Sequence, residues 1–156
     1  MKKLFIVILV AFVIIQFFPI DKKNPPVNKG MDFLNIKTIE PSTAQLIRNS
    51  CYDCHSNETR YPWYASVAPS SWFIKNHIEE ARKELNFSTF ATYEPSRQIK
   101  KMEEAAEMIE KREMPLESYF IGHQDAKLTD AQRKVLVDFF KKEIQDTKIK
   151  NWQGAR

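Results

Sequence analysis

The sequence predicts an all-α domain that follows an apolar N-terminal helix. Apolar residues recur at helical spacing in several segments, and no segment shows strong alternation of apolar and polar residues. A chain of 156 residues is long enough for one domain. We find no internal repeat, and we divide the chain into an N-terminal segment 1–20, a linker 21–34, the domain 35–145 and a C-terminal tail 146–156.

The N-terminal segment 1–20 has the pattern of an export signal, because Lys2 and Lys3 precede an almost wholly apolar run. No small residue follows the run until Gly30, so a signal peptidase site is missing. We therefore expect the segment to stay in place as a membrane anchor, since it approaches the minimum span length of about 17 residues. The linker 21–34 contains two adjacent prolines and is expected to be a semi-extended tether.

The helices of the domain are expected where apolar residues recur every three or four positions. The expected ranges are 41–50, 70 or 71 to 85, 95–111 and 129–145. Thr129 and Gln132 form a capping box at the start of the last helix. Before the first helix, residues 31–40 have the character of an irregular lead-in, with apolar side chains that can pack on the domain. These side chains are Phe33, Leu34 and Ile36.

The charge of the chain is mild. The formal net charge is +4, and two of the positive charges are Lys2 and Lys3, which precede the folded part. No basic run with interleaved aromatic residues occurs, so we expect no nucleic-acid partner.

The chemical centre of the chain is the stretch from Cys51 to His55, which reads C-x-x-C-H. This is the attachment sequence for a c-type haem. Two thiols add across the two vinyl groups of haem and form thioethers, so both thiols must lie on one short segment beside the ring. The next histidine supplies its imidazole to the iron as the proximal ligand. We therefore predict one covalent haem, bound through Cys51 and Cys54, with His55 on the iron.

A thiol redox site and a zinc site are the alternatives for a C-x-x-C pair. A thioredoxin-like pair opens a helix in a βαβ unit, whereas the surroundings here are helical and irregular. A structural zinc site needs a second pair of ligands, and His77 and His123 stand alone and far apart. Cys51 and Cys54 are the only cysteines, so a framework of several disulfides is not expected.

An aromatic stretch from Arg60 to Tyr64 follows the motif closely. Core filling and a role in the haem pocket both remain open for it, and one does not exclude the other. The Arg60 guanidinium, the Trp63 indole N–H and the Tyr64 hydroxyl are natural donors to a haem propionate.

The iron has a second axial position besides that of His55. Met114 is the first candidate, because it lies in a loop and Pro115 behind it restricts its backbone. A thioether ligand favours reduced iron. A histidine or an open site remains the alternative, and the two further methionines are expected in the core or on a helix surface. The other candidates are His77, His123, Met102 and Met108.

The order of these features resembles class I cytochrome c: a helix, C-x-x-C-H, a Met-Pro loop and a final helix. More closely, the chain resembles the family of small membrane-anchored haem-binding domains of cytochrome-c-like type, over about residues 35–145. The stretches that carry the resemblance are 51–59, 61–64, 85–88, 113–116 and 126–129.

This resemblance implies covalent haem through Cys51 and Cys54, with His55 proximal and Met114 distal. In class I cytochromes a proline carbonyl usually accepts a hydrogen bond from the proximal imidazole. Pro62 and Pro69 are the available prolines, and the sequence does not choose between them.

The function expected from the sequence is one-electron transfer by a monohaem c-type cytochrome rather than enzymatic catalysis. Covalent haem attachment in bacteria takes place outside the cytoplasmic membrane, so the domain should face the periplasm on a single-pass anchor. Its redox partner proteins are unknown. The alternatives are a five-coordinate haem that senses a gas or reacts with peroxide, and a haem-bearing interaction subunit.

Overall fold

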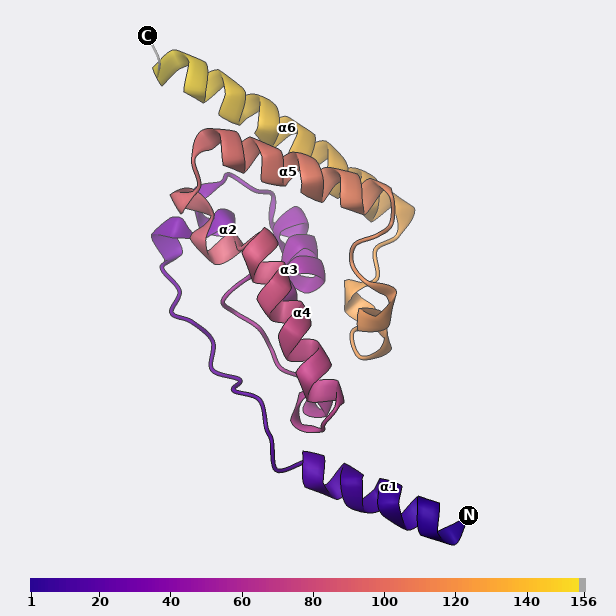
Figure 1. Ribbon diagram of the computed structural model, residues 1–156. Helices are drawn as coiled ribbons and strands as arrows, with labels where there is room; N and C mark the ends of the chain where they lie inside the picture. Colours follow the sequence, from indigo (N-terminus) through magenta and orange to yellow (C-terminus); the bar gives the residue numbers. More distant parts are fainter. Residues whose placement is uncertain (155–156) are drawn as a thin grey trace.

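The computed structural model describes residues 1–154, which form helices joined by loops without any strand (Figure 1). The all-α prediction is therefore confirmed for this part of the chain. The α-helices are α1 (Lys2–Ile15), α2 (Phe33–Ile36), α3 (Pro41–His55), α4 (Ser70–Glu84), α5 (Pro95–Glu110) and α6 (Asp130–Gly154). Short 3-10 helices are η1 (Lys29–Met31), η2 (Trp63–Ser66), η3 (Phe87–Thr92), η4 (Glu117–Ile121) and η5 (Gln124–Ala126).

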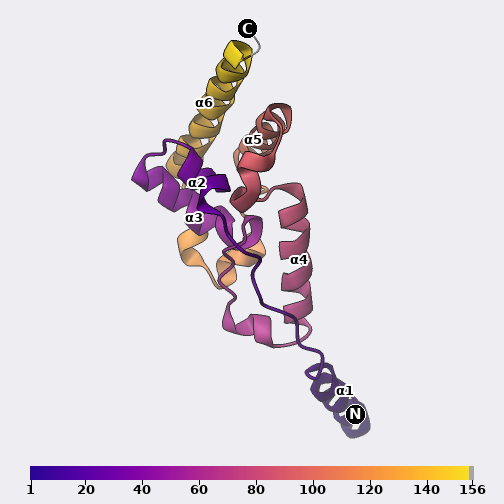
Figure 2. The same cartoon turned by 90° about the vertical axis from the view of Figure 1, so that its left-hand side faces the viewer.

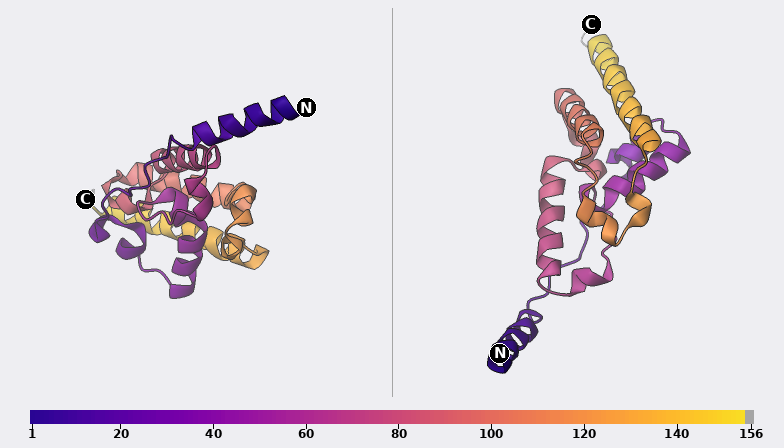
Figure 3. Two further views of the ribbon diagram at one scale, coloured as in Figure 1. Left: turned by 90° about the horizontal axis from the view of Figure 1, so that it is seen from below. Right: turned by 90° about the vertical axis from the view of Figure 1, so that its right-hand side faces the viewer.

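Helices α5 and α6 lie side by side and run in opposite directions at one end of the molecule (Figures 1 and 2). Helices α3 and α4 pack on each other beside this pair. The loop between α5 and α6 carries η4 and η5, and η5 packs against α3. Helix α1 extends from the opposite end, so that the N-terminus and the end of α6 lie far apart (Figures 1 and 3).

The predicted helix starts at residues 41 and 95 are confirmed, since Pro41 and Pro95 each occupy the first turn of their helix. Proline suits this position because its missing N–H would have no partner in the helix. The capping box is also confirmed. The Thr129 backbone N–H donates to the Gln132 side chain (2.8 Å), and the Gln132 backbone N–H donates to the Thr129 hydroxyl (3.2 Å).

Two helices run past their predicted ends. Helix α3 continues through the motif to His55, because no proline or glycine interrupts residues 42–55. Helix α6 continues to Gly154, so most of the predicted tail is helical. Thr147 lies in these extra turns and is buried, and its hydroxyl accepts a hydrogen bond from Lys37 Nζ at 3.3 Å. Lys37 also forms an ion pair with the buried Glu143 at 3.2 Å, so the segment after α2 holds this part of α6.

The core is built around Phe33, which lies in the predicted linker but is fully buried. Its ring centroid is 4.8 Å from that of Phe90 and 5.1 Å from that of Phe87. Phe139 and Phe140 of α6 approach it to 6.1 Å and 6.0 Å. The short helix α2 thus joins η3 to α6, and the core begins earlier in the chain than residue 35.

Helix α1 covers 14 residues of the predicted N-terminal anchor, and its large apolar side chains are exposed. Within residues 1–154, no helix combines the length and the apolar character needed to cross a membrane.

The central position of Phe33 predicts a large loss of stability when its ring is removed. Phe33→Ala should lower the free energy of unfolding by about 3–5 kcal/mol, because it leaves a cavity among four aromatic rings. Phe73→Ala is the matched control, since Phe73 is 58% exposed and its loss should change stability by at most about 0.5 kcal/mol. Denaturant unfolding followed by circular dichroism measures both, and equal effects would contradict the central role of Phe33.

Candidate functional site

A cavity of about 630 Å³ lies between the end of α3, helices α4 and α5, and the loop after α5. This size lies within the range of binding sites for small molecules and cofactors. Much of its wall is apolar, with Leu85, Phe87 and Phe140 among the lining residues. The charged residues on the wall come from α4 and α5.

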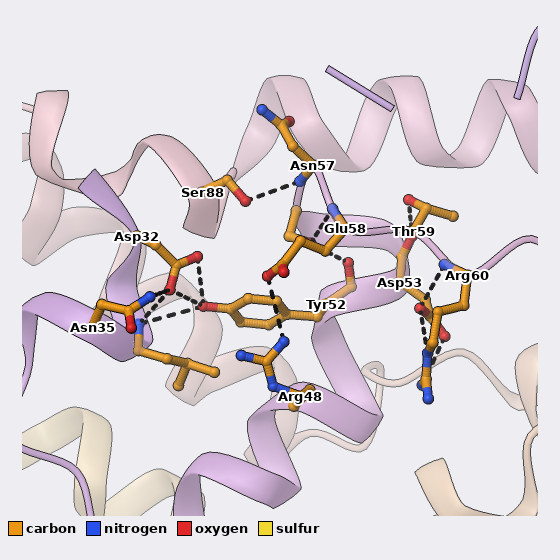
Figure 4. A network of polar contacts seen from close by, with 12 residues as sticks. Asp32, Asn35, Arg48, Tyr52, Asp53, Asn57, Glu58, Thr59, Arg60 and Ser88 are labelled. Atoms are coloured by element: carbon orange, nitrogen blue, oxygen red, sulfur yellow. Dashed lines mark hydrogen bonds and ion pairs between the residues drawn. The ribbon is translucent and has the colours of Figure 1, made fainter. Parts of the chain in front are cut away.

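The C-x-x-C-H motif contributes three residues to this cavity wall, namely Cys51, Cys54 and His55. They share one face because the motif forms the last turn of α3, where positions three and four apart are neighbours. The two intervening residues, Tyr52 and Asp53, are buried elsewhere (Figure 4). The positions of these residues around the helix axis therefore place three of them at the cavity and the other two in contacts that hold the helix.

The His55 imidazole is oriented by backbone carbonyls at the end of α4. Its Nδ1 lies 3.0 Å from the Ala81 oxygen and 3.1 Å from the Leu85 oxygen. Because carbonyls only accept, Nδ1 carries the proton and Nε2 keeps a free lone pair. Burial lowers the pKa of His55, which favours the neutral ring.

These contacts correct the expectation that Pro62 or Pro69 accepts the hydrogen bond from the proximal imidazole. Ala81 and Leu85 supply the acceptors instead. The reason is the direction of α4, whose C-terminal end meets the C-terminal end of α3. The Leu85 carbonyl lies just beyond α4, while the Ala81 carbonyl also accepts the Leu85 backbone N–H (2.9 Å) and offers its second lone pair to His55.

The two thiols are free and half-buried. Burial, followed by the neighbouring thiol Cys54, raises the pKa of Cys51 to about 12. Burial, followed by the charge of Asp53, raises the pKa of Cys54 to about 11. A reactive redox thiol needs a lowered pKa, so this environment does not favour thiol chemistry.

Met114 lines the same cavity from the loop after α5. Helix α5 ends where Arg112 adopts a left-handed conformation, with φ of 62°. The backbone N–H of Met114 then donates to the Met108 carbonyl (3.1 Å), and Arg133 Nη1 donates to the Met114 carbonyl (2.8 Å). The backbone of Met114 is thus fixed on both sides of its Cα atom.

Met108, a less favoured ligand candidate that was expected in the core or on a helix surface, also lines the cavity. It belongs to a stripe on α5 next to the buried stripe of Met102, Ala106 and Ile109. The helical spacing of this stripe is the signal that could have revealed it. Met102 is buried in the core, as predicted. The members of the second stripe are Lys101, Glu104, Ala105 and Met108.

The two histidine candidates lie in different places. His77 lines the cavity, and its Nδ1 is 2.9 Å from the Phe73 carbonyl oxygen. His123 is not part of the lining. Its ring stacks on that of Tyr119, with centroids 4.1 Å apart, and Tyr119 itself lines the cavity.

The residues of the aromatic stretch do not line the cavity. Arg60 forms an ion pair with Asp53 at 3.1 Å (Figure 4). Trp63 is 80% exposed and packs edge-on against Tyr64. The Tyr64 hydroxyl lies 3.5 Å from His123 Nδ1. Propionate contacts from Arg60, Trp63 and Tyr64 remain a prediction that this arrangement does not support.

The family model for haem-binding domains matches residues 10–142. The chain belongs to this haem-binding domain family. No curated protein and no solved structure matches the chain.

The site residues of this haem-binding domain fit the group that the family binds. Cys51 and Cys54 supply two neutral thiols on one side of the cavity, and His55 presents an unprotonated Nε2. The apolar side chains of the wall suit a large flat ring. These features are shown by the chain itself and do not depend on the family match.

A buried carboxylate links the motif of the haem-binding domain to the loop that carries Met114. Asp53 accepts hydrogen bonds from Arg60 Nε (3.1 Å), from Arg60 Nη2 (3.1 Å) and from the Tyr119 hydroxyl (2.6 Å). Burial, and then the hydrogen bond to Asp53, raise the pKa of Tyr119, so its hydroxyl stays protonated and donates. The loop that carries Met114 is therefore attached to the same helical turn that carries the cysteines.

The bond between Tyr119 and Asp53 predicts a specific loss of order in this loop. Tyr119→Phe should cost about 1.5–3 kcal/mol, the range for a hydrogen bond to a charged group. Amide hydrogen exchange should rise in residues 116–123. Tyr61→Phe is the matched control, because the Tyr61 hydroxyl makes no hydrogen bond in the described part of the chain. Unchanged exchange in Tyr119→Phe would show that other contacts hold the loop.

Proposed function

We propose that the protein is a monohaem c-type cytochrome that transfers one electron at a time at the outer face of the cytoplasmic membrane. The observation that carries the proposal is the placement of Cys51, Cys54, His55 and Met114 around one cavity. When bound, the haem iron supplies exchange between the ferric and ferrous states. The chain supplies attachment, orientation and exclusion of water.

Covalent attachment uses the two neutral thiols. Each S–H would add across one vinyl C=C bond of haem, so that sulfur would bond to one carbon and the proton would go to the other. Cys51 and Cys54 are three positions apart on a helix, so both sulfur atoms lie on the same face. This spacing supports attachment of both thiols to one haem.

His55 and Met114 are the residues that would bind the haem iron. His55 is held by two carbonyl acceptors, which fix its tautomer and leave Nε2 as the ligand atom. Met114 is held by Arg133 through its backbone carbonyl. A thioether in this position raises the reduction potential relative to a second imidazole.

Among the described residues of the cavity wall, Lys101 is the only lysine or arginine. We assign to it the contact with a haem propionate that the sequence suggested for Arg60. Its Nζ donates to Glu104 (2.7 Å) and to Glu84 (3.1 Å), which joins α5 to α4. Its side chain is only 13% exposed. A cation in this position favours the added electron and can pair with a haem propionate.

The location is assigned from the apolar segment 1–20 and the need for haem attachment outside the cytoplasm. A five-coordinate haem is the second candidate function. It is favoured by His77, whose imidazole lies on the cavity wall and can supply a polar group beside a bound gas or peroxide.

Replacement of the distal methionine separates these two functions. Met114→Ala should abolish the weak far-red iron–sulfur band of the oxidised protein, lower the reduction potential and allow rapid carbon monoxide binding. Met108→Ala is the matched control, because Met108 lines the same cavity and should leave all three properties unchanged. Carbon monoxide binding by the unaltered reduced protein would favour the five-coordinate site. Loss of the band in Met108→Ala alone would assign Met108 as the ligand.

The position of Lys101 predicts an electrostatic effect on the iron. Lys101→Gln should lower the reduction potential by on the order of tens of millivolts. The substitution removes a positive charge that is mostly shielded from solvent and leaves the carboxylates of Glu84 and Glu104 unpaired with it. Spectroelectrochemical titration measures the potential. Lys134→Gln removes a surface cation from the pair with Asp138 and should leave the potential unchanged. Equal potentials in Lys101→Gln and the native protein would place Lys101 away from the haem.

A further inference from the structure

The segment that follows α1 is hydrogen-bonded to the domain instead of forming a free tether. Gln16 and Ala68 exchange two hydrogen bonds. The Gln16 side chain donates to the Ala68 carbonyl (3.1 Å), and the Ala68 N–H donates to the Gln16 side-chain oxygen (3.0 Å). The Trp72 indole N–H donates to the Phe18 carbonyl at 2.9 Å. The end of the apolar segment is therefore joined to the start of α4.

The linker continues along the domain surface with further hydrogen bonds. Lys22 Nζ donates to the Ser66 hydroxyl at 2.8 Å. Asn24 donates to the Thr59 carbonyl (2.8 Å) and accepts from Arg82 (2.9 Å). Because these contacts come from three different parts of the domain, they hold the linker in one path.

Exposed aromatic side chains gather at the same end of the domain. We call Phe17, Phe18, Trp63, Trp72 and Phe73 the aromatic surface. Their exposed fractions range from 39% for Trp72 to 80% for Trp63. The start of α4 and the adjoining η2 lie at the end of the domain nearest α1 (Figures 1 and 2).

Basic side chains accompany the aromatic surface. Lys22 and Lys23 lie just after the apolar segment, separated from it by Asp21, and are exposed. Lys75 lies one turn into α4, and it lines a groove with Phe18 and Trp72. Glu79 lines the same groove and forms an ion pair with Lys75 at 3.7 Å, so the charge argument rests on Lys22 and Lys23. Lysines beside an apolar segment are attracted to anionic lipid headgroups.

We propose that the aromatic surface lies in the headgroup layer of a lipid bilayer and holds the domain in one orientation on the membrane. This inference rests on the proposed anchoring by residues 1–20. The argument for lipid is chain continuity, because the hydrogen bonds of Gln16 and Trp72 bring the start of α4 to the membrane wherever α1 inserts. Tryptophan is enriched at this depth, since its ring is apolar and its N–H polar.

The orientation sets the height of the site above the membrane. Helix α4 leads away from the aromatic surface, and Ala81, which orients His55, comes nine residues after Trp72. At 1.5 Å per residue Ala81 lies about 14 Å along α4 from Trp72, which is the greatest height above Trp72 that the helix can give the His55 contact. A haem held at this height stays close to redox partners embedded in the bilayer.

Fluorine NMR of the full-length haem-loaded protein in lipid nanodiscs tests the orientation. The chain has three tryptophans, which can be labelled with fluorotryptophan and assigned by single Trp→Phe variants. The discs contain phosphatidylcholine and phosphatidylglycerol, with or without a nitroxide near the headgroup. Trp63 and Trp72 should be broadened severalfold more by the nitroxide than Trp152, which lies at the far end of α6. Any broadening by the haem cancels in the comparison with nitroxide-free discs.

A paired variant links the broadening to the aromatic surface. Trp63→Ser with Phe73→Ser should reduce the broadening of Trp72 severalfold. Ile121→Ser with Ile149→Ser is the control, because both isoleucines are exposed outside the aromatic surface. Equal broadening of Trp72 and Trp152 in the native protein would overturn the inference while the anchor stands. Failure of the haem-loaded protein to co-purify with the discs would overturn both the inference and the anchor. Haem binding is tested separately, by the absorption spectrum of the same protein.

Discussion

The meeting of two helix ends at His55 is the contact on which the site depends. The Nδ1–H of His55 reaches the carbonyls of Ala81 and Leu85 at the C-terminal end of α4. One hydrogen-bond donor therefore joins α3 to α4 and fixes the imidazole tautomer, which leaves Nε2 unprotonated. A change in the course of α4 would remove the acceptors that orient the proposed iron ligand.

The helical phase of α3 lets one turn serve both chemistry and folding. Cys51, Cys54 and His55 face the cavity, while Tyr52 and Asp53 face the protein. The Tyr52 ring stacks on Phe87 in the core, and its hydroxyl donates to Asp32 (Figure 4). Because the two variable positions of the motif are buried in different contacts, the cysteines are held on a turn that cannot rotate independently of the core.

The sequence was sufficient to predict the features that depend on local patterns. Proline at positions 41 and 95 marked helix starts, and the motif marked the cysteines and histidine that the structure gathers at one cavity. Features set by burial were predictable only in part. Phe33 was expected to pack on the domain and is buried, but no local pattern identifies its partners in η3 and α6. Arg60 suggested a propionate contact because the sequence does not show that the nearby carboxylate of Asp53 is buried and takes the cation.

The loop that carries Met114 is tied to the motif at a distance from the methionine itself. Arg133 of α6 holds the Met114 carbonyl, and Tyr119 binds Asp53 inside the motif. The residues proposed for the two axial positions therefore belong to one connected framework, which includes the turn that holds both thiols. A framework of this kind limits movement of the ligands when the charge on the iron changes. The same contacts explain how a half-buried methionine on a loop can hold a set position without the support of a helix.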